Sequence, residues 1–138
     1  LILQNKNPEI FNDRVTRDYM YIDDAVSGYI LLAEKIPELT KENGNIIYNF
    51  GSGSHYSSKI IIETIIKLMN KPEIQPIYIP GDRKQEVIEQ YVSIDKIKQT
   101  LGWQPRYNLE EGLKKTIEWW LEKYRKRGYN EDSVKVKK

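Results

Sequence analysis

Two arginines have the side chains in this 138-residue sequence that best suit chemistry on a ligand. Arg17 opens a run of aromatic and aliphatic residues, and Arg83 follows a Pro-Gly-Asp turn between two predicted strands. A planar guanidinium forms paired hydrogen bonds with phosphate oxygens. On composition alone a surface salt bridge is the more ordinary role for each arginine, so their positions leave phosphate binding and ion pairing both open.

A glycine-serine turn at residues 51–53 stands after an apolar run and before a predicted helix, where a dinucleotide-binding fingerprint would lie. The fingerprint needs a third small residue at position 56, and Tyr56 occupies it. We therefore interpret the turn as a tight strand-to-helix connection without a cofactor. His55 is the single histidine, and the sequence shows no partner carboxylate or nucleophile for it. We interpret it as a solvent-facing loop residue.

The acidic pairs and the tryptophans have structural explanations. The pairs at 23–24 and 110–111 stand at predicted helix starts, where the helix dipole favours negative charge, so capping explains them without a metal ion. One histidine and no cysteine argue against a zinc site. Core packing is the favoured role of the tryptophans, because large aromatic residues dominate protein cores. Trp120 belongs to the predicted core stripe of the last helix.

The composition describes one soluble domain. The 22 basic and 20 acidic residues nearly cancel, which argues against a nucleic-acid-binding surface. No stretch approaches the roughly 18 consecutive apolar residues of a membrane helix, and no signal-peptide pattern opens the chain. The absence of cysteine fits a cytoplasmic protein. The chain opens on Leu1 rather than Met, which fits a cut inside a longer protein.

Short strands are predicted to alternate with helices, which is the pattern of an α/β protein. Strands are predicted at 9–11, 17–22, 46–50, 75–79 and 90–92, and helices at 24–36, 58–69, 94–101 and 109–127. The strand at 46–50 is almost continuously apolar, which is typical of a strand buried on both faces. Ser57, Ser93 and Asn108 are predicted N-caps, and Gly102 is a predicted helix stop.

Five segments, taken in order, resemble the extended short-chain dehydrogenase/reductases, which are NAD-dependent epimerases and dehydratases of nucleotide sugars. They are the Arg-Asp-aromatic run 17–26, the Tyr-Asn-Phe-Gly-Ser-Gly run 48–53, the loop 83–86, the Leu-Gly-Trp-Gln-Pro run 101–105 and the helix 109–119. The nearest flavour is a CDP-glucose or GDP-mannose 4,6-dehydratase. The resemblance covers residues 1–127 and implies the C-terminal substrate-binding portion of such an enzyme. The polar composition of residues 128–138 predicts a disordered tail.

The resemblance also implies roles for single residues. Arg17 and Arg83 would contact the diphosphate of the nucleotide sugar. Glu86 would orient Arg83 or meet a ribose hydroxyl, and Phe11 would lie near the base.

The same resemblance makes the missing parts informative. The family reaction uses NAD and a Tyr-x-x-x-Lys pair, in which the lysine lowers the tyrosine pKa. None of the ten tyrosines has a lysine four residues later. We therefore expect the parent enzyme to use NAD and this chain alone to bind none. We expect no catalytic residue in this chain. Its expected partner is the missing N-terminal Rossmann portion. We expect either exposed apolar surface at 46–50 or a homodimer that covers it. The alternative function is a non-enzymatic nucleotide-sugar-binding or interaction module.

Overall fold

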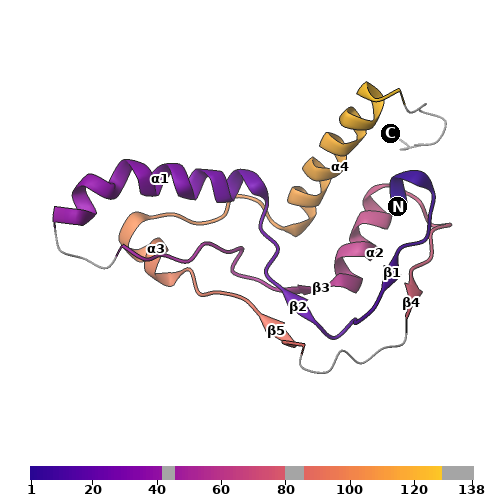
Figure 1. Cartoon of the computed structure of the whole chain (residues 1–138), viewed down its shortest axis with the longest axis horizontal. Helices are drawn as coiled ribbons and strands as arrows, with labels where there is room; N and C mark the ends of the chain where they lie inside the picture. The colour runs from indigo at the N-terminus through magenta and orange to yellow at the C-terminus, as the bar shows by residue number, and fades with distance from the viewer. Residues whose placement is uncertain (42–45, 80–85, 129–138) are drawn as a thin grey trace.

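The chain folds as a mixed α/β protein, as expected (Figure 1). The computed structural model describes residues 1–41, 46–79 and 86–128. The elements are, in order, η1 Ile2–Gln4, β1 Glu9–Ile10, β2 Thr16–Arg17, α1 Ile22–Lys41, β3 Tyr56–Ser57, α2 Ser58–Leu68, β4 Ile77–Tyr78, β5 Glu89–Gln90, α3 Asp95–Leu101 and α4 Leu109–Lys126.

The strands are short and form two small sheets. In the first, β1 pairs in parallel with β4, with Glu9 opposite Ile77. In the second, β2 lies between β3, which is antiparallel to it, and β5, which is parallel. Both sheets join the first part of the chain to a stretch far along the sequence, and Figure 1 shows β1 beside β4. The pairing thereby places Arg17 opposite Tyr56 on one side and Gln90 on the other.

Two predicted strands differ from the observed structure. Residues 46–50 run without a strand partner in the described part of the chain, and the Ile47 side chain is 74% exposed. A strand needs a neighbour to satisfy its backbone hydrogen bonds, and none is offered here. The strand predicted at 17–22 ends at Arg17, because the Tyr21 carbonyl already accepts the backbone N–H groups of Asp24 and Ala25. Those bonds start α1.

The predicted helix caps are largely confirmed. The Ser57 hydroxyl accepts from the Ile60 N–H at 3.3 Å, and Asn108 forms a reciprocal capping box with Glu111. Gly102 ends α3 with a φ of 68°, a left-handed conformation that glycine adopts without strain. Ser93 lies one residue before the observed N-cap of α3, and its hydroxyl accepts from the Asp95 N–H at 3.2 Å.

The role predicted for the acidic pair at the start of α1 is incomplete. Asp23 is exposed, as a charge at a helix N-terminus can be. Asp24 is fully buried, and its carboxylate accepts the backbone N–H groups of Arg106 and Tyr107 at 3.1 Å each. The Arg106 Nε also donates to it, at 3.3 Å. Asp24 therefore ties α1 to the connection that leads into α4.

Apolar side chains pack together in two places. One gathers Ile2, Met69 and Ile74 between η1 and the end of α2. In the other, the Phe50 ring lies edge-on to the buried Trp103 ring, with centroids 5.2 Å apart. The glycine of α1 at position 28 makes this contact possible, because a Cβ there would lie 2.4 Å from the Phe50 ring.

Two tryptophans predicted to be buried are exposed instead, and so are large apolar side chains of α1. Trp120 is 40% exposed and Trp119 is 53% exposed on α4, so core packing holds only for Trp103. On α1, Tyr29 is 64% exposed and Ile36 is 43% exposed, because the helix turns its Asp24 and Gly28 side inward. These apolar surfaces are left uncovered in the described chain.

Candidate functional site

Arg17 lies on the central strand of the three-stranded sheet and is half-buried. Its Nη1 donates to the Thr16 carbonyl at 2.8 Å and to the Val87 carbonyl at 2.9 Å. The second bond reaches across to the stretch that enters β5. Two backbone carbonyls thus fix one terminal nitrogen of the guanidinium. They hold the Arg17 side chain against the stretch that enters β5.

Glu86 immediately precedes Val87, the residue whose carbonyl accepts from Arg17. Its Oε2 accepts from the Asn12 side-chain amide at 3.0 Å. The Asn12 Oδ1 in turn accepts from the Arg14 N–H at 3.1 Å, which closes a tight turn. Glu86 is therefore held by the loop between β1 and β2.

Phe11, next to Asn12, is 49% exposed. Arg17 bonds to the residue after Glu86, and Glu86 bonds to the residue after Phe11. Three of the four predicted site residues therefore lie on segments that hydrogen bonds join. Arg83 lies outside the described residues. The suggestion that Glu86 orients Arg83 stays a prediction for the same reason.

The glycine-serine turn is held by a carboxylate that the sequence did not single out. The Asp18 Oδ1 accepts from the Ser52 N–H at 2.7 Å. A Cβ on Gly51 would lie 2.4 Å from the other carboxylate oxygen and 2.7 Å from Val92. The glycine therefore allows the turn to pack on Asp18, and the turn leads into β3, which pairs with the strand of Arg17.

His55 has a partner that sequence reasoning missed. Its Nε2 lies 3.1 Å from the Glu89 carboxylate, and its ring stacks on Tyr91 with centroids 4.7 Å apart. The two partners come from β5 and the residue after it, on the other side of β2. No local sequence signal links position 55 to position 89, because only the sheet order brings β3 and β5 to the same central strand.

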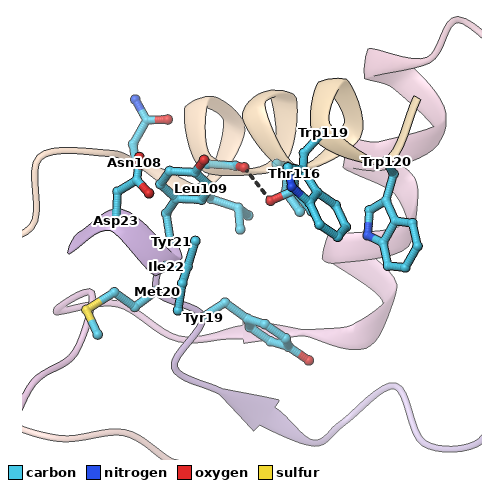
Figure 2. Close-up of a pocket in the computed structure, with 12 residues that line it drawn as sticks. Tyr19, Met20, Tyr21, Ile22, Asp23, Asn108, Leu109, Thr116, Trp119 and Trp120 are labelled. Atoms are coloured by element: carbon cyan, nitrogen blue, oxygen red, sulfur yellow. Dashed lines mark hydrogen bonds between the residues drawn. The ribbon is translucent and has the colours of Figure 1, made fainter. Parts of the chain in front are cut away.

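An aromatic cavity of about 550 Å³ lies between residues 19–23 and α4 (Figure 2). Tyr19 and Tyr21 line it from the segment after Arg17, and Trp119 and Trp120 line it from α4. Gly112 lets that segment approach, because a Cβ there would lie 3.0 Å from Tyr21. The sequence analysis assigned the two tryptophans to a core and the two tyrosines to a strand, and it did not predict a cavity between them.

Metal-ligating clusters and membrane-spanning helices are both absent from the described residues. These ranges contain no group of three or more side chains that would suit a metal ion. None of the helices in the same ranges has both the length and the apolar character needed to cross a bilayer.

Comparisons with known proteins identify the family. The family model described as GDP-mannose 4,6 dehydratase matches residues 1–116. A UDP-glucuronate 4-epimerase from Thermodesulfobacterium geofontis is 33% identical over 120 residues, which are 86% of this chain and 34% of that protein. The solved UDP-glucose 4-epimerase from Thermotoga maritima, crystallised with UDP-glucose, is 29% identical with a TM-score of 0.70, over 88% of this chain and 37% of its own.

A third relative carries the cofactor. The UDP-glucuronic acid 4-epimerase from Bacillus cereus, solved in complex with NAD, is 25% identical with a TM-score of 0.67, over 94% of this chain and 37% of its own. This chain spans about a third of the length of the curated relatives that it matches. The family model covers well over half of the sequence and the folds agree. The chain therefore belongs to the GDP-mannose 4,6-dehydratase family, among the NAD-dependent epimerases and dehydratases of nucleotide sugars.

Proposed function

We propose that this chain is the nucleotide-diphosphate-sugar-binding portion of an NAD-dependent epimerase or 4,6-dehydratase and that it is inactive without a Rossmann portion. Arg17, Arg83, Glu86 and Phe11 form its substrate-binding set. The observation that carries the proposal is the position of Arg17, whose guanidinium is fixed by the Val87 carbonyl beside Glu86. A pre-positioned guanidinium fork suits the oxygens of a diphosphate, because little side-chain freedom is lost on binding.

Exposed apolar surface supports the Rossmann portion as a partner. Ile22, Val26, Tyr29 and Ile36 follow one another at helical spacing along α1, and all are between 43% and 64% exposed. Ile46 and Ile47, which are 41% and 74% exposed, add to this surface. Monomeric proteins seldom leave contiguous apolar patches of this kind uncovered. The sheet of a Rossmann portion would bury the exposed face of α1 and pair with residues 46–50. A homodimer is the alternative way to bury the same surface.

The chemistry of the missing portion supports the proposed inactivity. In the family, NAD supplies the hydride transfer when it is bound. A tyrosine needs a nearby lysine to act as the base at neutral pH, and this chain has no Tyr-x-x-x-Lys sequence. The residues of this chain hold the nucleotide end of the substrate in this proposal.

Ligand titration tests the binding half of the proposal. Binding of UDP, CDP, GDP and dTDP is measured by ¹H–¹⁵N NMR, with inorganic phosphate as reference. We expect at least one nucleotide to bind more tightly than phosphate, and Arg17→Ala to weaken it about tenfold or more, the size of a lost charge-assisted bond. Arg14→Ala is the matched control, since it removes an exposed guanidinium three residues away. If no nucleotide binds better than phosphate up to high millimolar concentration, the proposal is wrong.

An activity assay tests the other half. The chain with NAD and a panel of nucleotide sugars should yield no 4-keto product. The same chain mixed with the N-terminal two-thirds of a relative, such as the Thermodesulfobacterium epimerase, should bind that portion. Turnover by the isolated chain would contradict the proposed inactivity, and binding of neither the portion nor a nucleotide would favour the interaction-module alternative.

A further inference from the structure

A side-chain contact joins the two outer strands of the three-stranded sheet. The Nε2 atom of His55, the residue before β3, lies 3.1 Å from the Glu89 carboxylate on β5. The His55 ring also stacks on the Tyr91 ring, a phenol that carries no charge near neutral pH. β2 lies between β3 and β5 and carries Arg17. The contact therefore ties together both neighbours of the strand that bears the candidate diphosphate-binding side chain.

β5 and the residues just before it hold the Arg17 side chain. Val87, two residues before Glu89, offers the carbonyl that accepts from Arg17 Nη1 at 2.9 Å. The backbone between them is bonded to β2 as well, because the Thr16 N–H donates to the Ile88 carbonyl at 2.8 Å. If β5 moved away from β2, both bonds would break. The Arg17 side chain would then keep only its bond to the Thr16 carbonyl and would regain rotational freedom.

Glu89 is the ion-pair partner of His55 in the described part of the chain. β2 contributes two further charged groups near this contact. The Asp18 carboxylate accepts from the backbone of the glycine-serine turn at 2.7 Å, and the Arg17 guanidinium is bonded to backbone carbonyls. α2 contributes Lys59, whose ammonium lies over a tyrosine ring. The charge on His55 is therefore paired with β5 rather than with β2 or α2.

We infer that His55 and Glu89 are positioning residues, whose contact holds β5 on β2 and so keeps the Arg17 guanidinium ready for a diphosphate; this inference rests on the proposed function. Histidine changes charge between about pH 5 and 8. The contact is an ion pair only while His55 is protonated, and it becomes a weaker neutral contact as the pH rises. Both side chains are partly exposed, so the effect of the ion pair is modest, about two- to fivefold.

Amide hydrogen exchange measures the hold of β5 on β2 without any ligand. The N–H groups of Thr16 and Asp18 donate to carbonyls of the β5 stretch, so their exchange reports its opening. After correction for intrinsic exchange rates, we expect their protection to fall about two- to fivefold from pH 5.5 to pH 8, the effect of one exposed ion pair. The Ile77 N–H is bonded in the other sheet and is the control, so its protection should stay constant.

Titration with UDP-glucose and GDP-mannose, followed by NMR at the same two pH values, measures the effect on the site. Both phosphates of a nucleotide sugar are diesters, so the ligand keeps its charge in this range, whereas the terminal phosphate of a free nucleotide titrates near pH 6. We expect the tighter ligand to bind about two- to fivefold more strongly at pH 5.5. Glu89→Gln keeps an acceptor for His55 and removes the charge, so it should abolish the pH difference in exchange and in affinity. Glu9→Gln, on the exposed side of β1, is the matched control and should keep both differences.

The outcomes separate this inference from the proposed function. If Glu89→Gln keeps the pH difference in affinity, protonated His55 attracts the diphosphate directly and the positioning role is wrong. The role is also wrong if protection at Thr16 does not change with pH, or if Glu89→Gln lowers protection at Ile77 as much as at Thr16. If exchange behaves as expected but neither nucleotide sugar binds better than phosphate, the contact holds β5 and the proposed function fails, together with any role in positioning Arg17.

Discussion

The buried carboxylate of Asp24 gives the sharpest test of how this fold is held together. It has no exposed surface and accepts from two backbone N–H groups and one guanidinium nitrogen on the connection before α4. In Asp24→Asn the oxygen that meets Arg106 can remain. The other oxygen becomes an amide NH₂ that faces the Tyr107 N–H, so one bond is lost and two donors oppose each other.

The size of the effect follows from those contacts. Hydrogen bonds to charged groups contribute about 1.5–3 kcal/mol each, and a buried donor left without a partner costs about 1–3 kcal/mol. The variant also loses the charge that favours the helix N-terminus, worth about 0.3–1 kcal/mol. Because the first two figures describe the same lost bond and are not added, we expect Asp24→Asn to lower the free energy of unfolding by about 2–4 kcal/mol.

Urea unfolding followed by tryptophan fluorescence measures this difference, because Trp103 lies in the core that α1 covers. Asp23→Asn is the matched control: it removes a neighbouring carboxylate from the same helix turn, but that side chain is exposed. It should cost no more than about 1 kcal/mol, the helix-dipole contribution. If the two variants differ by less than about 0.5 kcal/mol, the buried bonds do not hold α1 to the connection.

Two further substitutions test the packing and the buried charge. Gly28→Ala should destabilise the chain by about 1–3 kcal/mol in the same assay, because its Cβ would overlap the Phe50 ring, and a stabilised variant would contradict the packing. Lys71 is 3% exposed and donates to the Ile2 carbonyl and the Asn5 side chain. Burial lowers the pKa of Lys71 below its usual 10.5, so the unfolded state binds more protons between the folded pKa and 10.5. Stability should therefore rise with pH through that window relative to Lys71→Met, and parallel pH curves for the two proteins would refute this.

Local features of the fold were predictable from the sequence. A capping box needs only Asn108 and Glu111 three residues apart, and a helix stop needs only Gly102, so both are written in neighbouring residues. The α/β class followed from the alternation of apolar runs with helical spacing. The family resemblance likewise rests on short ordered motifs, and the family match confirms it.

Features that depend on distant residues were not predictable. Asp24 looked like a cap because its partners stand 82 and 83 residues away. Residues 46–50 have the composition of a strand buried on both faces, yet a strand forms only where a neighbour exists. Trp120 repeats at core spacing, but the surface that it faces is a cavity at α4. In each case the residue types were interpreted correctly as apolar or acidic, and the missing information was which segment lies opposite.

The pairing of β2 with β5 has a consequence for how the site comes into being. The bond from Arg17 to Val87 joins residues 70 apart, and the bond from Asn12 to Glu86 spans 74. Parallel pairing over such separations cannot start from a local hairpin, and contacts of this range slow folding. During synthesis the arginine leaves the ribosome well before its acceptor carbonyl exists. The Arg17 side chain can therefore take its observed position only after the stretch that carries Glu86 and Val87 has been made.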